Sequence, residues 1–321
     1  MHEKETVATL CGKLYFADHY DAPRSIHHHE VSRVLADERS PYQHIQIFDT
    51  RKHGRVLVLD GFPQISERDG WLYTEAMILP ALLAHPNPRR VLILGGGDGA
   101  AASFSAHDPR VQSITIVDLD KKVVELTQLH LFSLWENARR YSKKLDITVG
   151  DALAFLKRDL AQYDIIISDI TDPNESESAA HLLGIEFFAL ISARLAPNGI
   201  LAMQSGENAQ NTKTAHQGFL NLVSKNFSRH LTSALYIPWF SAEWSFTFAR
   251  NSEPLPDFAD IFIAKRLFKQ QRDLISSLQA LTIGKLVAMF AATEPDSPLD
   301  PGYRSRTRFV NGANRIAPLL K

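Results

Sequence analysis

The sequence lacks most of the features that mark secreted, membrane-bound or nucleic-acid-binding proteins. Its single cysteine is Cys11, so an internal disulfide and a cysteine-rich metal site are both excluded. No stretch reaches the roughly 18 apolar residues of a membrane span, and the N-terminus has no apolar segment of signal-peptide length. The formal net charge of −1 gives no overall basic field for nucleic acid or anionic lipid. We therefore expect a soluble, cytoplasmic protein in which any charged site is local.

Metal-binding patterns are scarce as well. The histidines at 27, 28 and 29 are consecutive, but no second set of ligands follows them at a suitable spacing. We interpret this run as a solvated patch and expect no metal site.

The N-terminal part of the chain alternates between polar and apolar residues, as antiparallel strands do. Two such segments, 42–50 and 54–66, are separated by the polar stretch RKHG, in which Gly54 suits a hairpin turn. From Trp71 the apolar residues recur at helical spacing, and this pattern ends at two prolines, 86 and 88.

After these prolines, short apolar strands alternate with amphipathic helices. The pattern predicts strands at 91–94, 114–117, 145–149, 165–168 and 200–204. Helices are predicted at about 100–106, 121–134, 152–160 and 184–195. Such alternation is typical of a parallel, doubly wound α/β sheet that is covered on both faces. Ligands of these sheets bind beyond the carboxyl ends of the strands, so the residues there are the candidates for a site.

The first strand end carries a glycine-rich turn, VLILGGGDGAAAS. Gly95, Gly97 and Ala100 satisfy G-x-G-x-x-G/A between a strand and a helix, which is the context of a nucleotide-binding turn. Asp98 lies inside this turn, where its carboxylate would repel a pyrophosphate. An adenosyl ligand that carries a cation fits the turn better than a dinucleotide does.

Carboxylates follow the next two strands. Asp118 lies about 20 residues past the glycines, where a carboxylate can accept both ribose hydroxyls. Asp151 is either a plain helix N-cap or the acceptor for an adenine amino group, and the two roles are compatible.

The fourth strand runs into ISDITDPNESES, a stretch of acids without a basic residue. Asp169 and Asp172 follow the buried-looking YDIIIS, and Glu175 and Glu177 come next. A negative pocket beside an adenosyl site suits a polycation. We interpret the two glutamates as solvated loop charges that only attract it.

As a set, these segments resemble the spermidine synthase family of aminopropyltransferases. The resemblance lies in GRVLVLDGFPQISERDGWLYTEA, HPNPRRVLILGGGDG, VDLD, GDALAFL and YDIIISDITDP, in the order and spacing of the family, and more weakly in RSPYQHI and LAPNGILAMQSG. It implies a small N-terminal antiparallel β domain, residues 1–70, followed by a methyltransferase-type Rossmann-like catalytic domain, residues 71–321. It also implies a homodimer without a prosthetic group that uses decarboxylated S-adenosylmethionine and a di- or polyamine.

The resemblance assigns donor contacts to seven residues: Gln43, Gly95, Gly97, Asp98, Asp118, Asp151 and Ala152. Among these, Asp98 would hold the aminopropyl ammonium, Asp118 the ribose and Asp151 the adenine. Acceptor contacts fall to Gln64, Tyr73, Asp169, Asp172 and Phe240.

The implied reaction fits these residue types. The donor's sulfonium is already an activated electrophile that leaves as neutral methylthioadenosine, so neither a metal nor a covalent nucleophile is required. The attacking amine, with a pKa near about 10.4, must first lose a proton. Asp169 can bind the cation and then take that proton, while Tyr73 positions the amine, so we expect these two to be the catalytic residues.

Two departures from the family's sequence pattern leave the identity of the acceptor amine open. Thr74 stands where the family has His or Gln, and IPWFSAEW replaces IPTYPSG, which puts Phe240 where a tyrosine contacts the acceptor. This segment is closer to that of thermospermine synthases, and its tryptophans either hold an ammonium group by cation–π attraction or pack a terminal hairpin. Alternatives are a thermospermine- or spermine-type synthase, a polyamine-binding protein without turnover, and a methyltransferase, which Asp98 disfavours. The hypothesis of a dehydrogenase that uses NAD is weaker still, because Asp98 would repel the pyrophosphate of that cofactor.

Overall fold

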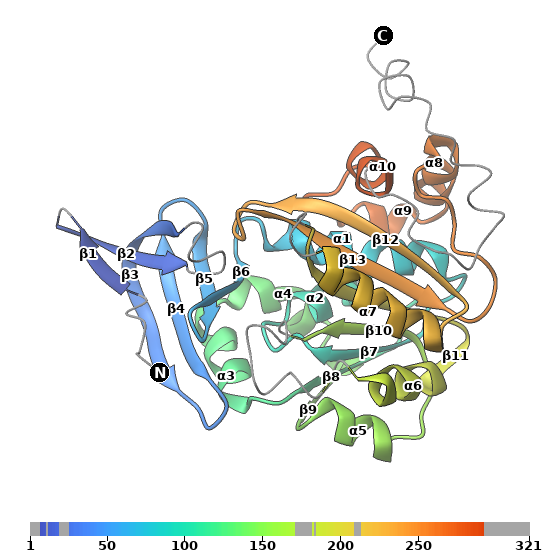
Figure 1. Ribbon diagram of the computed structural model, residues 1–321, viewed down its shortest axis with the longest axis horizontal. Coiled ribbons are helices and arrows are strands. Elements are labelled where there is room, and N and C mark those ends of the chain that lie inside the picture. The colour runs from blue at the N-terminus through green and yellow to red at the C-terminus, as the bar shows by residue number, and fades with distance from the viewer. Residues whose placement is uncertain are drawn as a thin grey trace, which may run out of the picture.

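A computed structural model describes residues 7–10, 12–18, 26–170, 182, 184–208 and 213–291 (Figure 1). Cys11 and the acidic residues Asp172, Glu175 and Glu177 lie outside these ranges. The described chain forms two sheets, with the N-terminal one drawn in blue beside the larger one.

The first sheet is a six-stranded antiparallel meander in which sequential strands are neighbours. Its strands are β1 (Val7–Leu10), β2 (Lys13–Asp18), β3 (His27–Arg39), β4 (His44–Thr50), β5 (Gly54–Leu59) and β6 (Phe62–Ser66). The sequence pattern predicted one strand over 54–66, but the structure has two. They are joined at Asp60 and Gly61, which both have positive φ (51° and 83°), as a two-residue Asp-Gly hairpin turn requires.

The second sheet has seven strands in the order β12-β13-β11-β10-β7-β8-β9. Five of these run parallel: β7 (Arg90–Gly95), β8 (Ser113–Asp118), β9 (Leu145–Val149), β10 (Tyr163–Asp169) and β11 (Leu195–Glu207). The hairpin of β12 (Arg229–Ile237) and β13 (Ala242–Arg250) is added antiparallel to β11. The expected α/β fold, a small antiparallel sheet followed by a doubly wound sheet, is confirmed.

Helices cover both faces of the second sheet (Figure 1). One face carries α1 (Gly70–Ala84), α2 (Ala100–His107), α4 (Phe132–Arg140) and the C-terminal helices α8 (Ile261–Gln270), α9 (Arg272–Ile275) and α10 (Ile283–Ala291). The other carries α5 (Ala152–Arg158), α6 (Ile185–Arg194) and α7 (Lys213–Asn226). In β7, Val91 and Ile93 enter one core while Leu92 and Leu94 enter the other. Burial on both faces explains why these strands read as continuous apolar runs.

The helix predicted over 121–134 is broken in the structure. Two helices take its place: α3 (Lys121–His130), and α4, which begins after Leu131. The ψ of 40° at Leu131 departs from helical geometry. A short 3₁₀ turn, η1 (Ser142–Lys144), follows α4. The break lets α4 bring Trp135 under Gly99, where an added Cβ would lie 2.2 Å from the indole ring. No proline or glycine marks the position, so the sequence pattern gave no sign of it.

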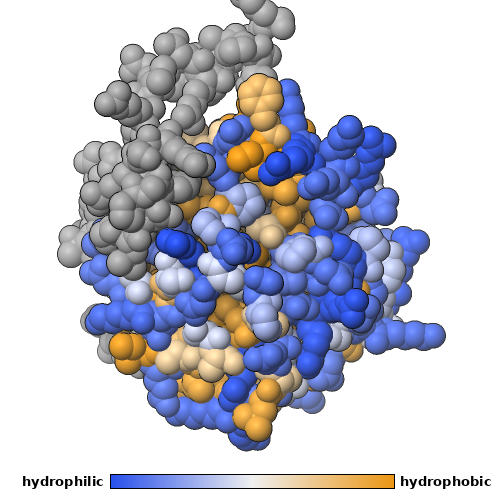
Figure 2. All heavy atoms as spheres, turned by 90° about the vertical axis from the view of Figure 1, so that its right-hand side faces the viewer, coloured by the Kyte–Doolittle hydropathy of each residue, from blue (hydrophilic) through white to orange (hydrophobic). Residues whose placement is uncertain are grey.

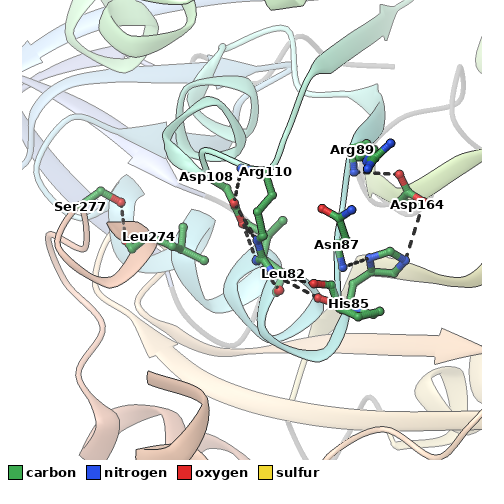
Figure 3. Close-up of polar contacts among 10 residues, drawn as sticks. Leu82, His85, Asn87, Arg89, Asp108, Arg110, Asp164, Leu274 and Ser277 are labelled. Carbon is green, nitrogen blue, oxygen red and sulfur yellow. Dashed lines mark hydrogen bonds and ion pairs between the residues drawn. The ribbon is translucent and has the colours of Figure 1, made fainter. Parts of the chain in front are cut away.

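An ion pair between a partly exposed arginine and a buried aspartate fixes the C-terminal end of α1 (Figure 3). Arg110 pairs with the fully buried Asp108 at 2.6 Å and donates to the carbonyl oxygens of Leu82 and His85. These carbonyls have no partner within the helix, so the guanidinium serves as their cap. The helix is therefore anchored at the sheet edge where β7 begins, opposite its strand-end carboxylates.

One face of the molecule can be followed in a space-filling view. In the space-filling view of Figure 2, hydrophilic residues alternate with small, separate apolar areas. No helix within the described ranges is both long enough and apolar enough to cross a bilayer.

Candidate active site

A pocket lies between the carboxyl ends of β7, β8 and β10 and the edge of the first sheet. Its walls include Leu57 and Pro63 from the first sheet and Phe240 and Trp244 from the β12–β13 hairpin. None of the described residues that line it is Lys, Arg or His. These described residues therefore present carboxylates to a ligand without a side-chain cation to neutralise them.

The glycine turn brings these strand ends close together. Gly95 has a φ of 81°, and a Cβ there would lie 2.2 Å from the backbone oxygen of Asp169. A Cβ on Gly97 would lie 2.5 Å from a carboxylate oxygen of Asp118, to which the Gly97 N–H donates at 2.9 Å. Both positions require glycine because a side chain would separate the turn from the carboxylates.

The carboxylate of Asp98 is held inside this turn. It accepts the Ala100 N–H at 2.7 Å, at the start of α2. Burial, and next the nearby charge of Asp169, raises the pKa of Asp98. A positively charged ligand group would reverse this effect by favouring the ionised form.

Asp118 and Asp151 face the pocket from two neighbouring strand ends. The two oxygens of Asp118 accept the N–H groups of Gly97 and Asp120, each at 2.9 Å. Burial, helped by the charge of Asp120, raises the pKa of Asp118 to about 6. Asp151 caps α5 by accepting the Ala154 N–H at 2.7 Å. The N-cap role is thus present, and the adenine contact stays a prediction.

Tyr73 and Asp169 form a direct pair across the pocket. The buried Tyr73, on α1, donates its hydroxyl to Asp169 Oδ1 at 2.8 Å. Its ring meets Phe240 and Phe246 edge to face, with centroids 5.6 and 5.3 Å away. Burial raises the pKa of Asp169 and the charge of Asp118 adds to the rise, while the bond from Tyr73 opposes it. The pair combines a base with raised proton affinity and a rigidly held hydroxyl.

The two predicted glutamines approach from the first sheet. Gln43, in the turn between β3 and β4, donates its amide to Asp120 at 3.0 Å. Gln64, on β6, donates to the carbonyl of Phe62, two residues earlier in the same strand, at 3.2 Å. Both side chains line the pocket.

Aromatic residues form the wall beyond Asp169. The rings of Phe240 and Trp244 lie 4.8 Å apart, and the Trp244 indole N–H donates to Gln204 at 3.1 Å. Gln204 in turn donates to Ile170 O at 2.8 Å, directly after Asp169. One amide therefore fixes the aromatic wall to the end of β10.

The turn at the tip of the β12–β13 hairpin joins this wall to the first sheet. Ser241, with a φ of 54°, closes the turn by donating its N–H to Pro238 O at 3.2 Å. Phe240 lines the pocket, whereas Trp239 is fully buried among first-sheet residues such as Phe16 and Phe48. The tryptophan at 239 therefore packs in the core, while Trp244 lines the site.

His29 packs against Trp239, with ring centroids 4.6 Å apart, and is buried. The expected solvated histidine patch is therefore wrong for this residue, although His28 is exposed. The alternation of strand β3 turns one of the three side chains inward.

The structure brings almost all of the predicted site residues together. Eleven of them line this one pocket: Gln43, Gln64, Tyr73, Gly95, Gly97, Asp98, Asp118, Asp151, Ala152, Asp169 and Phe240. Asp172 lies outside the described residues. Thr74 does not line the pocket, because its hydroxyl donates to Gly70 O within α1.

Sequence reasoning missed two residues of this region. Asp120 contacts Gln43 and the Asp118 loop, and Gln204 contacts Trp244 and Ile170. Each stands within three residues of a strand end, in the segments VDLD and LAPNGILAMQSG, so the strand-end rule gave their location but not their contacts.

Comparisons with known proteins agree with this geometry. The family model described as the spermine/spermidine synthase domain matches residues 71–259, and the spermidine synthase tetramerisation domain matches residues 14–67. A polyamine aminopropyltransferase 2 of Pseudomonas aeruginosa is 34% identical over 223 residues, which cover 70% of this chain and 64% of that protein. The thermospermine synthase ACAULIS5 of Arabidopsis thaliana is 33% identical over 226 residues, covering 70% of this chain and 66% of that protein.

A solved spermidine synthase from Thermotoga maritima has the same fold. The TM-score is 0.77 over 91% of this chain and 95% of that one, at 23% identity. The first family model alone spans more than half of the 321 residues, and the resemblance seen in the sequence is thereby confirmed. The chain belongs to the spermine/spermidine synthase family.

Proposed function

We propose that the protein is an aminopropyltransferase. It moves the aminopropyl group of decarboxylated S-adenosylmethionine to a di- or polyamine and releases methylthioadenosine. The first candidate for the acceptor is putrescine, which would give spermidine. The observation that carries this proposal is the hydrogen-bonded pair of Tyr73 and Asp169, which shares one pocket with the carboxylates of Asp98 and Asp118. No prosthetic group takes part, because the donor is a co-substrate.

The donor lies along the carboxyl ends of β7, β8 and β9. Asp118 accepts the ribose hydroxyls, and Asp151 with Ala152 binds the adenine at the start of α5. Asp98 receives the ammonium of the aminopropyl arm. The same carboxylate would face the carboxylate of intact S-adenosylmethionine, which argues against a methyltransferase.

The acceptor enters beside Asp169 as an ammonium ion. Asp169 takes one proton, and Tyr73 keeps the neutral nitrogen aligned with the donor methylene. The nitrogen then forms a C–N bond as the C–S bond breaks, and the electron pair of that bond remains on sulfur as a neutral thioether. Alignment in one pocket supplies up to about 7 to 11 kcal/mol of the barrier reduction in well-oriented systems.

A longer polyamine is the second candidate acceptor. Phe240 cannot donate a hydrogen bond to a distal amine, and with Trp244 it offers aromatic faces that attract an ammonium group. The relationship to the Arabidopsis thermospermine synthase supports this candidate. Asp172, in its turn, is proposed to bind the far end of the acceptor.

We also propose that the protein self-associates as a homodimer. The match of residues 14–67 to a tetramerisation domain supports association through the first sheet. Analytical ultracentrifugation of the purified protein would measure its oligomeric state directly.

The test is incubation of the purified protein with decarboxylated S-adenosylmethionine and, separately, putrescine, cadaverine, agmatine and spermidine. We expect methylthioadenosine and one aminopropylated product by mass detection. In Asp169→Asn, turnover should fall at least about 100-fold because the base is lost. Asp146→Asn, at an exposed position on β9, is the matched control and should retain full activity.

Two outcomes would contradict the proposal. Donor binding without product from any amine would favour a polyamine-binding protein. Methyl transfer from intact S-adenosylmethionine would favour a methyltransferase.

A further inference from the structure

Asp120 joins the two sheets at the donor end of the pocket. It is almost fully buried, and one of its oxygens, Oδ2, accepts both the Ser40 hydroxyl at 2.6 Å and the Gln43 amide at 3.0 Å. Ser40 and Gln43 belong to the turn between β3 and β4, in the first sheet. Asp120 itself follows β8, two residues after Asp118.

The other side of Asp120 faces its own loop. Oδ1 accepts the Lys122 N–H at 3.0 Å and so caps α3, while the Asp120 N–H donates to Asp118 at 2.9 Å. A single residue thus contacts the loop that carries Asp118 and the turn that carries Gln43. Both of these side chains line the pocket.

The contact also fixes the orientation of an amide. A carboxylate only accepts hydrogen bonds, so the NH₂ end of Gln43 must face Asp120. The Ser40 hydroxyl in turn accepts the N–H groups of Tyr42 and Gln43 at 3.1 Å, which orders the turn. The arrangement of polar groups that Gln43 offers a ligand is therefore set from outside the pocket.

We propose that Asp120 is a positioning residue that holds the β3–β4 turn and the Gln43 amide over the donor. It acts through Gln43 and touches neither substrate. The inference rests on the proposed function, since it treats this end of the pocket as the donor site.

The variant Asp120→Asn separates this role from folding. Asparagine keeps an oxygen for the Lys122 N–H and remains a good N-cap, so α3 is preserved. Its NH₂ group then faces Ser40 and Gln43, and the Gln43 amide must reverse or lose its partner. We expect methylthioadenosine, measured by calorimetry, to bind about tenfold more weakly, with kcat at saturating donor unchanged.

A double-mutant cycle tests whether the effect passes through Gln43. In a Gln43→Ala background, Asp120→Asn should weaken binding no further. Glu38→Gln is the matched control, because it removes an exposed ion pair with Lys122 that bridges the same two segments without touching Gln43. Equal weakening in both backgrounds would overturn the proposal, and so would an affinity for Asp120→Asn within twofold of the wild type.

Hydrogen exchange of the free protein gives a readout that needs no ligand. The amides of Tyr42 and Gln43 should exchange at least about tenfold faster in Asp120→Asn and at the wild-type rate in Glu38→Gln. Unchanged exchange in Asp120→Asn overturns the positioning role. Absence of methylthioadenosine binding by the wild type would instead count against the proposed function, and the exchange rates would still decide the role of Asp120.

Discussion

At the residue scale, the pocket concentrates negative charge where burial disfavours it. Asp98, Asp118 and Asp169 all have raised pKa values, and burial is the largest cause for each. An arrangement that costs free energy in the empty protein is typical of a binding site, because the ligand supplies the missing charge. Here the missing charge is positive.

The raised pKa values predict that donor binding depends on pH. Binding the donor's ammonium requires an ionised Asp98, so the affinity for decarboxylated S-adenosylmethionine should rise from pH 5 to pH 8, through the value of about 7 for Asp98. Methylthioadenosine is neutral and should show a much smaller change. Calorimetry of both ligands over this range checks the contrast, and parallel pH profiles would contradict it.

Most of the candidate site could be predicted from strand ends, because a parallel sheet gathers its carboxyl ends at one edge. Asp118 and Asp169 follow directly from that rule. Asp120 could not be assigned, since its contact with Gln43 spans 77 positions in the chain. The inward position of Trp239 was equally hidden, because it depends on how one turn meets another sheet.

At the element scale, α1 connects the site to the C-terminal helices. Two residues after Tyr73, the fully buried Glu75 accepts the N–H groups of Gln279, Ala280 and Leu281. These residues lie between α9 and α10. Burial raises the pKa of Glu75, while these three N–H groups oppose the rise. The carboxylate thus fixes the C-terminal segment against the helix that carries Tyr73.

We expect Glu75→Gln to destabilise the protein by about 2 to 3 kcal/mol, because a neutral amide replaces a charged acceptor of buried N–H groups. Urea unfolding measures this change in free energy. Glu136→Gln, at an exposed position on α4, should have almost no effect. Equal stability of the two variants would show that the bonds to residues 279–281 contribute little.

The turn of the β12–β13 hairpin leads to a second prediction at this scale, about the different roles of its two aromatic residues. Trp239→Ala should lower the free energy of unfolding by about 3 to 5 kcal/mol, because it empties a filled core. Phe240→Ala should cost less stability and should raise the KM for the amine, because this ring lines the pocket. Unfolding curves and acceptor kinetics of both variants check the division of roles. A stability loss for Phe240→Ala as large as that for Trp239→Ala would contradict it.

At the scale of the whole molecule, the two sheets close one site together. The second sheet supplies the carboxylates, and the first sheet supplies Gln43, Gln64 and part of the apolar wall. The fold class followed from strand and helix periodicity. The break at Leu131 was hard to place, because a bend without proline leaves the period almost intact. The Asp-Gly pair at 60 and 61, by contrast, is itself a hairpin signal, and the prediction of one strand overlooked it.

The raised pKa values of Asp98, Asp118 and Asp169 also predict how overall stability varies with pH. Their folded-state pKa values lie above the value of about 3.9 for an unfolded chain, so the folded state binds protons more tightly. Their stabilising contribution is complete below about pH 4 and is lost as the pH rises through the raised values. The lowered pKa of the buried His29 acts in the opposite sense up to about pH 6.5, so the melting temperature of the free protein should fall from pH 6.5 to pH 8.

Asp98→Asn supplies the comparison, because it removes one of these titrating groups. Its melting temperature should fall less steeply over the same range, and bound donor should reduce the fall in the wild type. A wild-type slope equal to that of Asp98→Asn would show that these carboxylates do not govern the pH response.

Two neighbouring residues of one tight turn differ in position: Trp239 lies inside the first-sheet core, and Phe240 packs against that core while it lines the pocket. An insertion or deletion in this turn would move both side chains at once, so that neither ring would occupy its present position. If evolution changed the amine preference by altering the length of this turn, the residues of the N-terminal sheet that pack around Trp239 would have to change as well. Protein engineers who wish to alter substrate range should keep the turn length and vary position 240 alone.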